Sequence, residues 1–351
     1  MTPQRYLIVR TSAIGDVVFA SGLPTAIKRV QPQAHITWLV EPGIQKLLLP
    51  DPNIDEIVTW SKSEWVHYWK EGRKLELVRS ILKLRRELQQ RKFDIALDLQ
   101  GLMKSGFLTW LSGARRRVGL GSKEGSQWLM TEVLPRGGDK RRIGSEYRFL
   151  AERLGFETED FVPRLFTSAE TESACQTLMQ DHGLQPGKFA VFAPFTTRPQ
   201  KHWFEDAWQV LAVRIRDELG MTPVILGGPS DKASAEQMAH GITGMIDLAG
   251  ATALPEAAAL IRQAGLLVGV DTGLTHMGSA FGTPTIALFG STCPYLDTGR
   301  SNARVIWLGM ECSPCRRRPT CNGAFTCLRN ITADQVMEAA FDLKRQAITK
   351  E

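Results

Sequence analysis

Several features that would assign this chain to a familiar class are missing from its sequence. No stretch of about 18 consecutive apolar residues occurs, so no segment is typical of a membrane-spanning helix. The first apolar run is short and is interrupted by polar Arg10, Thr11 and Ser12, which is unlike a secretory signal peptide. We therefore expect a cytoplasmic protein.

Common nucleotide-binding motifs are missing as well. The sequence has no Walker A motif, and its nearest approach to Gly-x-Gly-x-x-Gly, at Gly119, Gly121 and Gly125, has the wrong spacing. It also has no Asp-x-Asp pair of the kind that holds a divalent ion on a diphosphate. A net charge of +6 permits binding of phosphate, anionic lipid or nucleic acid and does not choose among them.

Short apolar runs alternate with amphipathic stretches along all 351 residues. Near-continuous apolar runs are typical of strands buried on both faces of a parallel sheet, so the pattern predicts an α/β protein. The predicted strands are Tyr6–Val9, Ile36–Val40, Ile57–Trp60, Ile95–Leu99, Val118–Leu120, Phe189–Ala193, Pro223–Leu226, Leu266–Val270, Thr285–Phe289 and Val305–Leu308.

The length suits two domains, and the boundary is predicted between residues 160 and 188. Thr167 and Glu170 resemble a capping box that starts a helix, and Gly183 and Pro186 then end it before the next strand. We predict domains over residues 1–170 and 171–331, with a C-terminal helix over 332–351 that packs back on the first domain. The carboxyl ends of both sets of strands should face a cleft.

A polar loop, residues 10–16, follows the first predicted strand. Gly15 permits a tight turn between strand and helix, and Asp16 then lies at the start of the helix. Asp16 has two compatible roles: it caps the helix, or it acts as a general base that accepts a proton from an acceptor hydroxyl.

Polar residues also follow strands in the second half of the chain. Thr196, Thr197 and Lys201 come after Phe189–Ala193, where hydroxyls and an ammonium suit a diphosphate and an ordinary polar loop is the alternative. The turn Asp271–His276 starts a helix, whose free amides and positive dipole end favour an anion. His276 is either an extra donor to the ligand or a packed helix residue.

Taken in order, these segments resemble glycosyltransferase family 9, the ADP-heptose:lipopolysaccharide heptosyltransferases, over nearly the whole chain. The matching segments are residues 11–16, 98–105, 196–203 and 270–276. The first, second and last are most similar to heptosyltransferase I, which adds the first heptose to Kdo of the inner core. The resemblance implies a GT-B architecture of two Rossmann-like domains, with the acceptor on the N-terminal domain and ADP-heptose on the C-terminal one.

The resemblance also implies an inverting transfer that needs no cofactor, carried out at the cytoplasmic face of the inner membrane on a Kdo-lipid A type acceptor. It assigns catalysis to Asp16 and Lys201. It assigns donor binding to Thr196, Thr197, Lys201, Asp271, Thr272, Gly273 and His276, and acceptor binding to Ser12, Gly15, Gln100 and Lys104. Asp271 cannot itself stabilise phosphate, so we expect it to bind a sugar hydroxyl or to organise its turn.

Four of the six cysteines, Cys312, Cys315, Cys321 and Cys327, lie close together in the sequence. In a reducing compartment such a cluster suggests a structural Zn or Fe site more readily than disulfides, although reduced loop cysteines are the alternative. The cluster departs from what heptosyltransferase I requires. It could mark a family-9 transferase with another acceptor, such as a second core sugar or a protein.

Basic and aromatic residues crowd the first half of the chain. Arg115–Arg117 and Lys140–Arg142 lie in loop-like sequence and are candidates for meeting a phosphorylated lipid. The segment from Trp65 to Trp69 could touch acceptor or membrane, or simply pack in the core. A basic nucleic-acid-binding protein is the alternative from another class, but no nucleic-acid-binding signature supports it, so we expect no such partner. A sugar-nucleotide epimerase would share the two-domain architecture.

Overall fold

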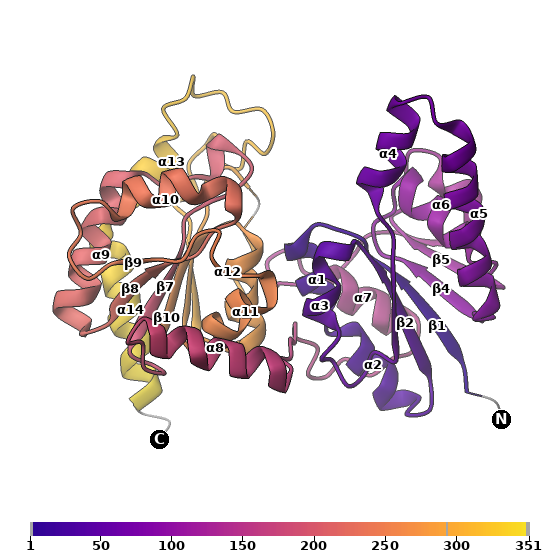
Figure 1. Ribbon diagram of the computed structural model, residues 1–351, viewed down its shortest axis with the longest axis horizontal. Helices are drawn as coiled ribbons and strands as arrows, with labels where there is room; N and C mark the ends of the chain where they lie inside the picture. Colours follow the sequence, from indigo (N-terminus) through magenta and orange to yellow (C-terminus); the bar gives the residue numbers. More distant parts are fainter. Residues whose placement is uncertain (1–2, 293, 349–351) are drawn as a thin grey trace. The chain divides into compact units, whose positions relative to one another are not determined.

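The computed structural model describes residues 3–292 and 294–348. The chain folds into two compact units, each built on one parallel six-stranded sheet (Figure 1). Unit 1 comprises Met1–Lys140 and Gly144–Phe166, and unit 2 comprises Arg141–Ile143 and Thr167–Glu351. The α/β class is therefore confirmed, and the main boundary lies at residues 166 and 167, where we expected it near residue 170.

The two sheets have the same strand order when the strands of each unit are numbered from its first strand and the second sheet is read from its β9 edge. Unit 1 runs β3-β2-β1-β4-β5-β6 and unit 2 runs β12-β11-β10-β7-β8-β9, which is the Rossmann order in both. The strands of unit 1 are β1 Arg5–Val9, β2 His35–Val40, β3 Glu56–Thr59, β4 Ile95–Asp98, β5 Arg116–Leu120 and β6 Glu132–Leu134. Those of unit 2 are β7 Phe189–Ala193, β8 Thr222–Ile225, β9 Ile246–Asp247, β10 Leu266–Val270, β11 Thr285–Leu288 and β12 Ala303–Ile306.

All ten predicted strands are present, and two further strands were missed. The missed strands, β6 and β9, each form one edge of a sheet and are three and two residues long. Neither contains a fully buried residue. They therefore lack the continuous apolar run by which the central strands were recognised.

Helices cover both faces of each sheet. In unit 1, α4, α5 and α6 cover one face and α1, α2, α3 and α7 the other (Figure 1). The helices of unit 1 are α1 Ile14–Ala20, α2 Leu23–Val30, α3 Pro42–Leu48, α4 Lys62–Lys70, α5 Lys74–Gln90, α6 Met103–Leu111 and α7 Ser145–Arg153. Those of unit 2 are α8 Ala169–Asp181, α9 Glu205–Leu219, α10 Lys232–Ala239, α11 Leu254–Gln263, α12 Gly273–Phe281, α13 Thr326–Arg329 and α14 Ala333–Ile348. Within the described residues, none of these helices combines the length and the apolar content that crossing a bilayer requires.

The C-terminal helix α14 packs in unit 2, which corrects our expectation that it returns to the first domain. Its apolar side chains Val336, Met337, Ala340 and Leu343 are buried in the same core as Trp208. This placement follows from the amphipathic pattern of α14, because its apolar stripe finds a matching face on α9.

Candidate functional site

Each sheet has one point where the strand order reverses, between β1 and β4 in unit 1 and between β7 and β10 in unit 2. Ligands of open α/β sheets bind outside the carboxyl ends of the strands at such switch points. The sequence-predicted site residues follow these four strands, so they form two candidate half-sites, one in each unit.

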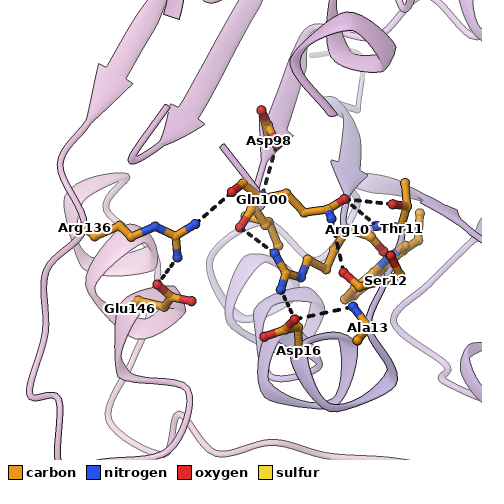
Figure 2. Close-up of polar contacts among 11 residues, drawn as sticks. Arg10, Thr11, Ser12, Ala13, Asp16, Asp98, Gln100, Arg136 and Glu146 are labelled. Carbon is orange, nitrogen blue, oxygen red and sulfur yellow. Dashed lines mark hydrogen bonds and ion pairs between the residues drawn. The ribbon is translucent and has the colours of Figure 1, made fainter. Parts of the chain in front are cut away.

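In unit 1, Gln100 ties the loop after β4 to the loop after β1 (Figure 2). Its Oε1 atom accepts hydrogen bonds from the backbone N of Thr11 at 3.0 Å and from the Thr11 hydroxyl at 2.8 Å. Its Nε2 atom donates to the carbonyl of Ser12 at 3.2 Å. With its amide engaged in this way, buried Gln100 positions the backbone of the first loop.

The turn that presents Gln100 is built by its neighbours. The Oδ1 atom of buried Asp98 accepts from the backbone N of Gln100 at 3.0 Å and of Gly101 at 3.1 Å. Gly101 has φ +67°, and a Cβ there would lie 2.6 Å from the carbonyl oxygen of Leu120, so the turn requires glycine. Burial raises the pKa of Asp98, although these amides and Arg10 act in the opposite direction.

Asp16 lies in the first turn of α1, paired with the guanidinium of Arg10 (Figure 2). The Oδ2 atom of Asp16 makes this ion pair and also accepts from the backbone N of Ala13 at 3.4 Å. The N-cap of α1 is Ala13, so Asp16 supports the helix start from the third helical position and is not the cap itself. Arg10 is 7% exposed and also donates to the carbonyl of Leu99 at 3.2 Å. Both contacts of Asp16 use one oxygen and 43% of the side chain is exposed, so the other oxygen is available to accept a proton.

Arg10, Arg136 and Glu146 belong to this half-site and were missed by sequence reasoning. Arg136 forms an ion pair with Glu146 and donates to the carbonyl of Gln100 at 2.8 Å. Burial alone would lower the pKa of Arg10, but Tyr147, Asp16 and Glu146 together raise it. Arg10 could have been found, because it directly follows a strand. Arg136 and Glu146 have no such sequence signal.

The structure places the remaining predicted acceptor residues as follows. Ser12 lies in the first loop and contributes its carbonyl to Gln100. Gly15 is the second residue of α1, so it does not form the tight turn we expected. Lys104, the second residue of α6, is half-buried near Lys62 and Arg10. Burial lowers the pKa of Lys104, and the positive charges of Lys62 and Arg10 lower it further. The negative charge of Glu41 acts in the opposite direction.

In unit 2, Lys201 from the loop after β7 meets Asp271 from the loop after β10. The Nζ atom of Lys201 lies 2.6 Å from Oδ2 of Asp271 and donates to the carbonyl of Asp271 at 2.9 Å. The two side chains are 16% and 17% exposed. A cation is thus fixed at the switch point, beside the first turn of α12.

His276 and Tyr295 extend this pair into a buried chain. The Nε2 atom of His276 lies 3.1 Å from Oδ1 of Asp271, and its Nδ1 atom lies 2.8 Å from the hydroxyl of Tyr295. A carboxylate only accepts hydrogen bonds, so Nε2 carries the proton. Burial raises the pKa of Tyr295, and the charge of Asp271 adds to this, so the phenol stays protonated. Tyr295 was missed, because it lies in the irregular loop after β11 and outside the segments that resemble the family.

Asp271 is held in its charged form. Burial alone would raise the pKa of Asp271, but the hydrogen bond and charge of His276 and the ammonium of Lys201 lower it well below its usual range. The carboxylate of Asp271 is therefore paired with Lys201 and with His276 of its own turn.

The loops around this chain leave donors for a ligand. Thr272 is the N-cap of α12, and its side chain makes no capping hydrogen bond to the first-turn amides that begin at Gly273. Thr196 and Thr197 lie partly or fully exposed in the loop after β7. Within this loop, His202 Nε2 lies 2.7 Å from the carbonyl of Thr196. Amides, hydroxyls and an ammonium can together bind a diphosphate.

The predicted metal-site cysteines lie between β12 and α14. Cys312 is exposed, Cys315 and Cys321 are half-buried, and Cys327 is buried; all four are free thiols. Burial raises the pKa of Cys327, and the other three thiols raise it further. In the part of the chain that the structure describes, no three His, Cys, Asp or Glu residues are arranged to hold a metal ion.

The basic run at residues 115–117 is part of the fold rather than a free loop. Arg116 opens β5 and pairs with Glu132 at 2.8 Å. Arg117 donates to the carbonyls of Leu129 at 2.8 Å and Ala114 at 2.7 Å. Because Arg116 and Arg117 lie in β5 and their side chains have partners within unit 1, our expectation that this run lies in a loop is wrong.

Comparisons with known proteins show which proteins this chain resembles. Residues 81–325 match the family described as glycosyltransferase family 9 (heptosyltransferase). The chain is 27% identical to lipopolysaccharide heptosyltransferase 1 of Pseudomonas aeruginosa, over 97% of this chain and 92% of that protein. Its fold is similar to that of a family 9 glycosyl transferase from Veillonella parvula, with TM-score 0.81, 22% identity and 98% coverage of both chains. It is also similar to E. coli heptosyltransferase WaaC with ADP-2-deoxy-2-fluoro heptose, with TM-score 0.73, 24% identity, and 95% and 98% coverage.

Proposed function

Because this chain belongs to glycosyltransferase family 9, the heptosyltransferases, we propose that it transfers a heptose from ADP-L-glycero-D-manno-heptose to the Kdo region of the lipopolysaccharide inner core. The observation that carries the proposal is the pair of half-sites. Asp16 lies at one switch point, and Lys201 with the open end of α12 lies at the other. The name of the P. aeruginosa relative and the sugar nucleotide in the WaaC structure support heptose as the sugar.

In this proposal the reaction is a single displacement that inverts the anomeric carbon. Asp16 accepts the proton of the acceptor hydroxyl as its oxygen bonds to the anomeric carbon of heptose. The bond from that carbon to the diphosphate breaks, and ADP leaves with the electron pair. Fixed donors then stabilise the charge that develops on ADP. These are Lys201, the hydroxyls of Thr196 and Thr197, and the first amides of α12.

The donor diphosphate competes with Asp271 for the ammonium of Lys201. The ammonium of Lys201 is neutralised by Asp271 in the free protein. A diphosphate must therefore share Lys201 with this carboxylate, which His276 holds on its other side. Thr272, Gly273 and His276 complete the donor side, while Ser12, Gly15, Gln100 and Lys104 serve the acceptor side.

Two further parts of the proposal concern the surroundings of the enzyme. The acceptor is a lipid, so we place the enzyme at the cytoplasmic face of the inner membrane, in transient contact with it. We also propose that Cys312, Cys315, Cys321 and Cys327 bind a structural zinc or iron ion. The Cys312-x2-Cys315 spacing supports this, because thiolate pairs at that spacing are typical of tetrahedral sites. The four thiols would have to converge on binding, since the described residues show no group arranged to hold a metal ion.

The deciding experiment is incubation with ADP-heptose and Kdo₂-lipid A, followed by mass spectrometry of the lipid. A mass increase of one heptose supports the proposal. An unmodified lipid with intact, ADP-binding protein contradicts the acceptor assignment and points to a second core sugar or a protein as acceptor.

A further inference from the structure

The tip of the α4–α5 hairpin exposes two large apolar side chains. Trp69 is 68% exposed at the end of α4, and Leu75 is 72% exposed at the start of α5. Only three residues, Glu71–Arg73, separate the two helices. Single exposed apolar residues are common, but two of this size on one short turn indicate a surface that contacts something apolar.

The exposed apolar surface continues along α5. Leu75, Val78 and Leu82 are spaced three and four residues apart, so they share one side of the helix. Val78 is 51% and Leu82 42% exposed. The opposite side of α5 carries Leu84 and Leu88, which are buried against the sheet. The helix is therefore apolar on both an inner and an outer stripe, and the core explains only the inner one.

Positive charge surrounds the outer stripe. Between residues 70 and 86 the sequence contains seven Lys and Arg residues and two Glu residues. The seven are Lys70, Arg73, Lys74, Arg79, Lys83, Arg85 and Arg86, and all are exposed. Apolar side chains bordered by Lys and Arg are typical of helices that lie at the surface of an anionic membrane. A partner protein with an apolar patch would not require this excess of one charge.

The hairpin is anchored to the rest of unit 1 by Trp65. The Nε1 atom of Trp65 donates to the hydroxyl of Ser80 at 2.9 Å and so joins α4 to α5. The ring of Trp65 packs edge-on against buried Trp60, with 5.4 Å between centroids, and against Phe107 of α6 at 6.4 Å. Trp65 is thus part of the packed structure, whereas Trp69 is presented outward.

The hairpin also borders a pocket near the acceptor half-site. A cavity of about 560 Å³ is lined by Glu41–Gly43 and by Lys62, Ser63 and Val66 of α4. Lys62 lies close enough to Lys104 to lower the pKa of that residue. Val66 is itself 40% exposed. An acceptor whose polar head enters this cavity would have its lipid end near α4.

We propose that the α4–α5 hairpin docks on an anionic lipid membrane, with Trp69 and Leu75 inserted between headgroups and the surrounding Lys and Arg residues on the lipid phosphates. The proposal deepens the proposed function, because it names the surface by which the enzyme reaches a membrane-bound acceptor. Membrane binding itself requires neither donor nor transfer.

The test is co-sedimentation of the full chain with vesicles, without any sugar nucleotide. Vesicles of phosphatidylcholine with one quarter phosphatidylglycerol are compared with pure phosphatidylcholine. The tip variant Trp69→Gln/Leu75→Gln and the charge variant Lys70→Gln/Lys74→Gln change only exposed side chains, so both should fold. The matched control is Trp128→Gln/Val210→Gln, which removes one Trp and one aliphatic residue exposed elsewhere (83% and 52% exposed).

We expect wild type and control to bind the anionic vesicles equally. The tip variant should bind these vesicles at least about tenfold more weakly than wild type. The charge variant should bind roughly 25-fold more weakly, since each basic residue near the surface contributes about fivefold. The proposal is overturned if wild type fails to sediment, binds neutral vesicles equally, or is matched by the tip variant. If vesicle binding follows the expected pattern while no heptose is transferred, only the proposed activity fails.

Discussion

The Nζ atom of Lys201 lies 2.6 Å from the Oδ2 atom of Asp271, although 70 residues separate the two in sequence. The same carboxylate bonds His276 through its other oxygen. The pair therefore fixes both the ammonium and the imidazole at the switch point of unit 2 before any ligand binds. In the proposed reaction, a diphosphate that shares Lys201 with Asp271 would therefore meet an ammonium that is already in position.

Replacing Lys201 should slow the reaction strongly. We expect Lys201→Met to lower kcat by about 10²–10³-fold, because a fixed donor to the leaving group is lost. Steady-state kinetics with ADP-heptose would show this. The matched change Lys232→Met, at an exposed position on α10, should leave kcat unchanged. A Lys201→Met enzyme with normal kcat would remove this residue from catalysis.

Replacing Asp16, the proposed base in unit 1, should affect turnover but not ADP affinity. Asp16→Asn should lower turnover by about 10²–10⁴-fold while ADP affinity, measured by calorimetry, stays near that of wild type. The control Asp160→Asn breaks a surface ion pair with Arg29 and should affect neither quantity. Equal loss of turnover and ADP affinity would show that Asp16 supports folding or donor binding instead.

Stability should depend on pH through Asp271. The pKa of Asp271 is lower in the folded chain than in the unfolded chain, so the folded state binds fewer protons. Its contribution is fully present above the unfolded value of about 3.9 and is lost as pH falls through the folded value. We expect the free energy of unfolding of wild type to exceed that of Asp271→Asn most near neutral pH, with the gap shrinking below about pH 4.

Urea unfolding at several pH values would measure this gap. The exposed Asp181, at the end of α8, provides a matched Asp181→Asn control. A gap between wild type and Asp271→Asn that stays constant down to the acid limit would contradict the argument.

Close packing at the donor half-site depends on Gly269 in β10. A Cβ at this position would lie 2.1 Å from the hydroxyl of Thr275, which donates to the carbonyl of Val270 at 2.6 Å. Gly269→Ala should therefore destabilise the protein by about 1–3 kcal/mol through overpacking. In contrast, Gly43→Ala has open space around its Cβ in α3 and should be neutral or slightly stabilising. Thermal unfolding of both variants checks the difference.

Metal content provides a further prediction. Protein purified under reducing conditions should contain about one zinc or iron per chain if the four thiolates form a tetrahedral site. The variant Cys312→Ser/Cys315→Ser should lose it, whereas Cys175→Ser, in α8, should keep it. Elemental analysis of intact wild-type protein that finds no metal would retire the site.

Much of the fold was predictable because it depends on local patterns. The central strands are continuous apolar runs, and polar residues after β1, β4, β7 and β10 identify the two half-sites. Helix starts were less certain, since the predicted cap Thr167 is one residue from the observed cap, Ser168. Two adjacent hydroxyl residues satisfy a capping pattern almost equally well.

The partners of the site residues could not be predicted in the same way. Arg136 reaches Gln100 from 36 residues away, and Tyr295 reaches His276 from 19 residues away, out of a loop with no regular pattern. Such contacts depend on how loops fold over the sheet, which periodicity does not encode. The destination of α14 was missed for a related reason, because an amphipathic stripe does not specify which face it covers.

The short segment Arg141–Ile143 belongs to unit 2 although its neighbours on both sides belong to unit 1. Its backbone bonds that of Asp297 in both directions, at 2.8 Å and 2.7 Å. No single cut can therefore divide the chain into two complete halves. Expression of residues 167–351 alone would leave the backbone of Asp297 without these partners. Efforts to produce unit 2 by itself should supply the tripeptide, for example by grafting it onto the new terminus.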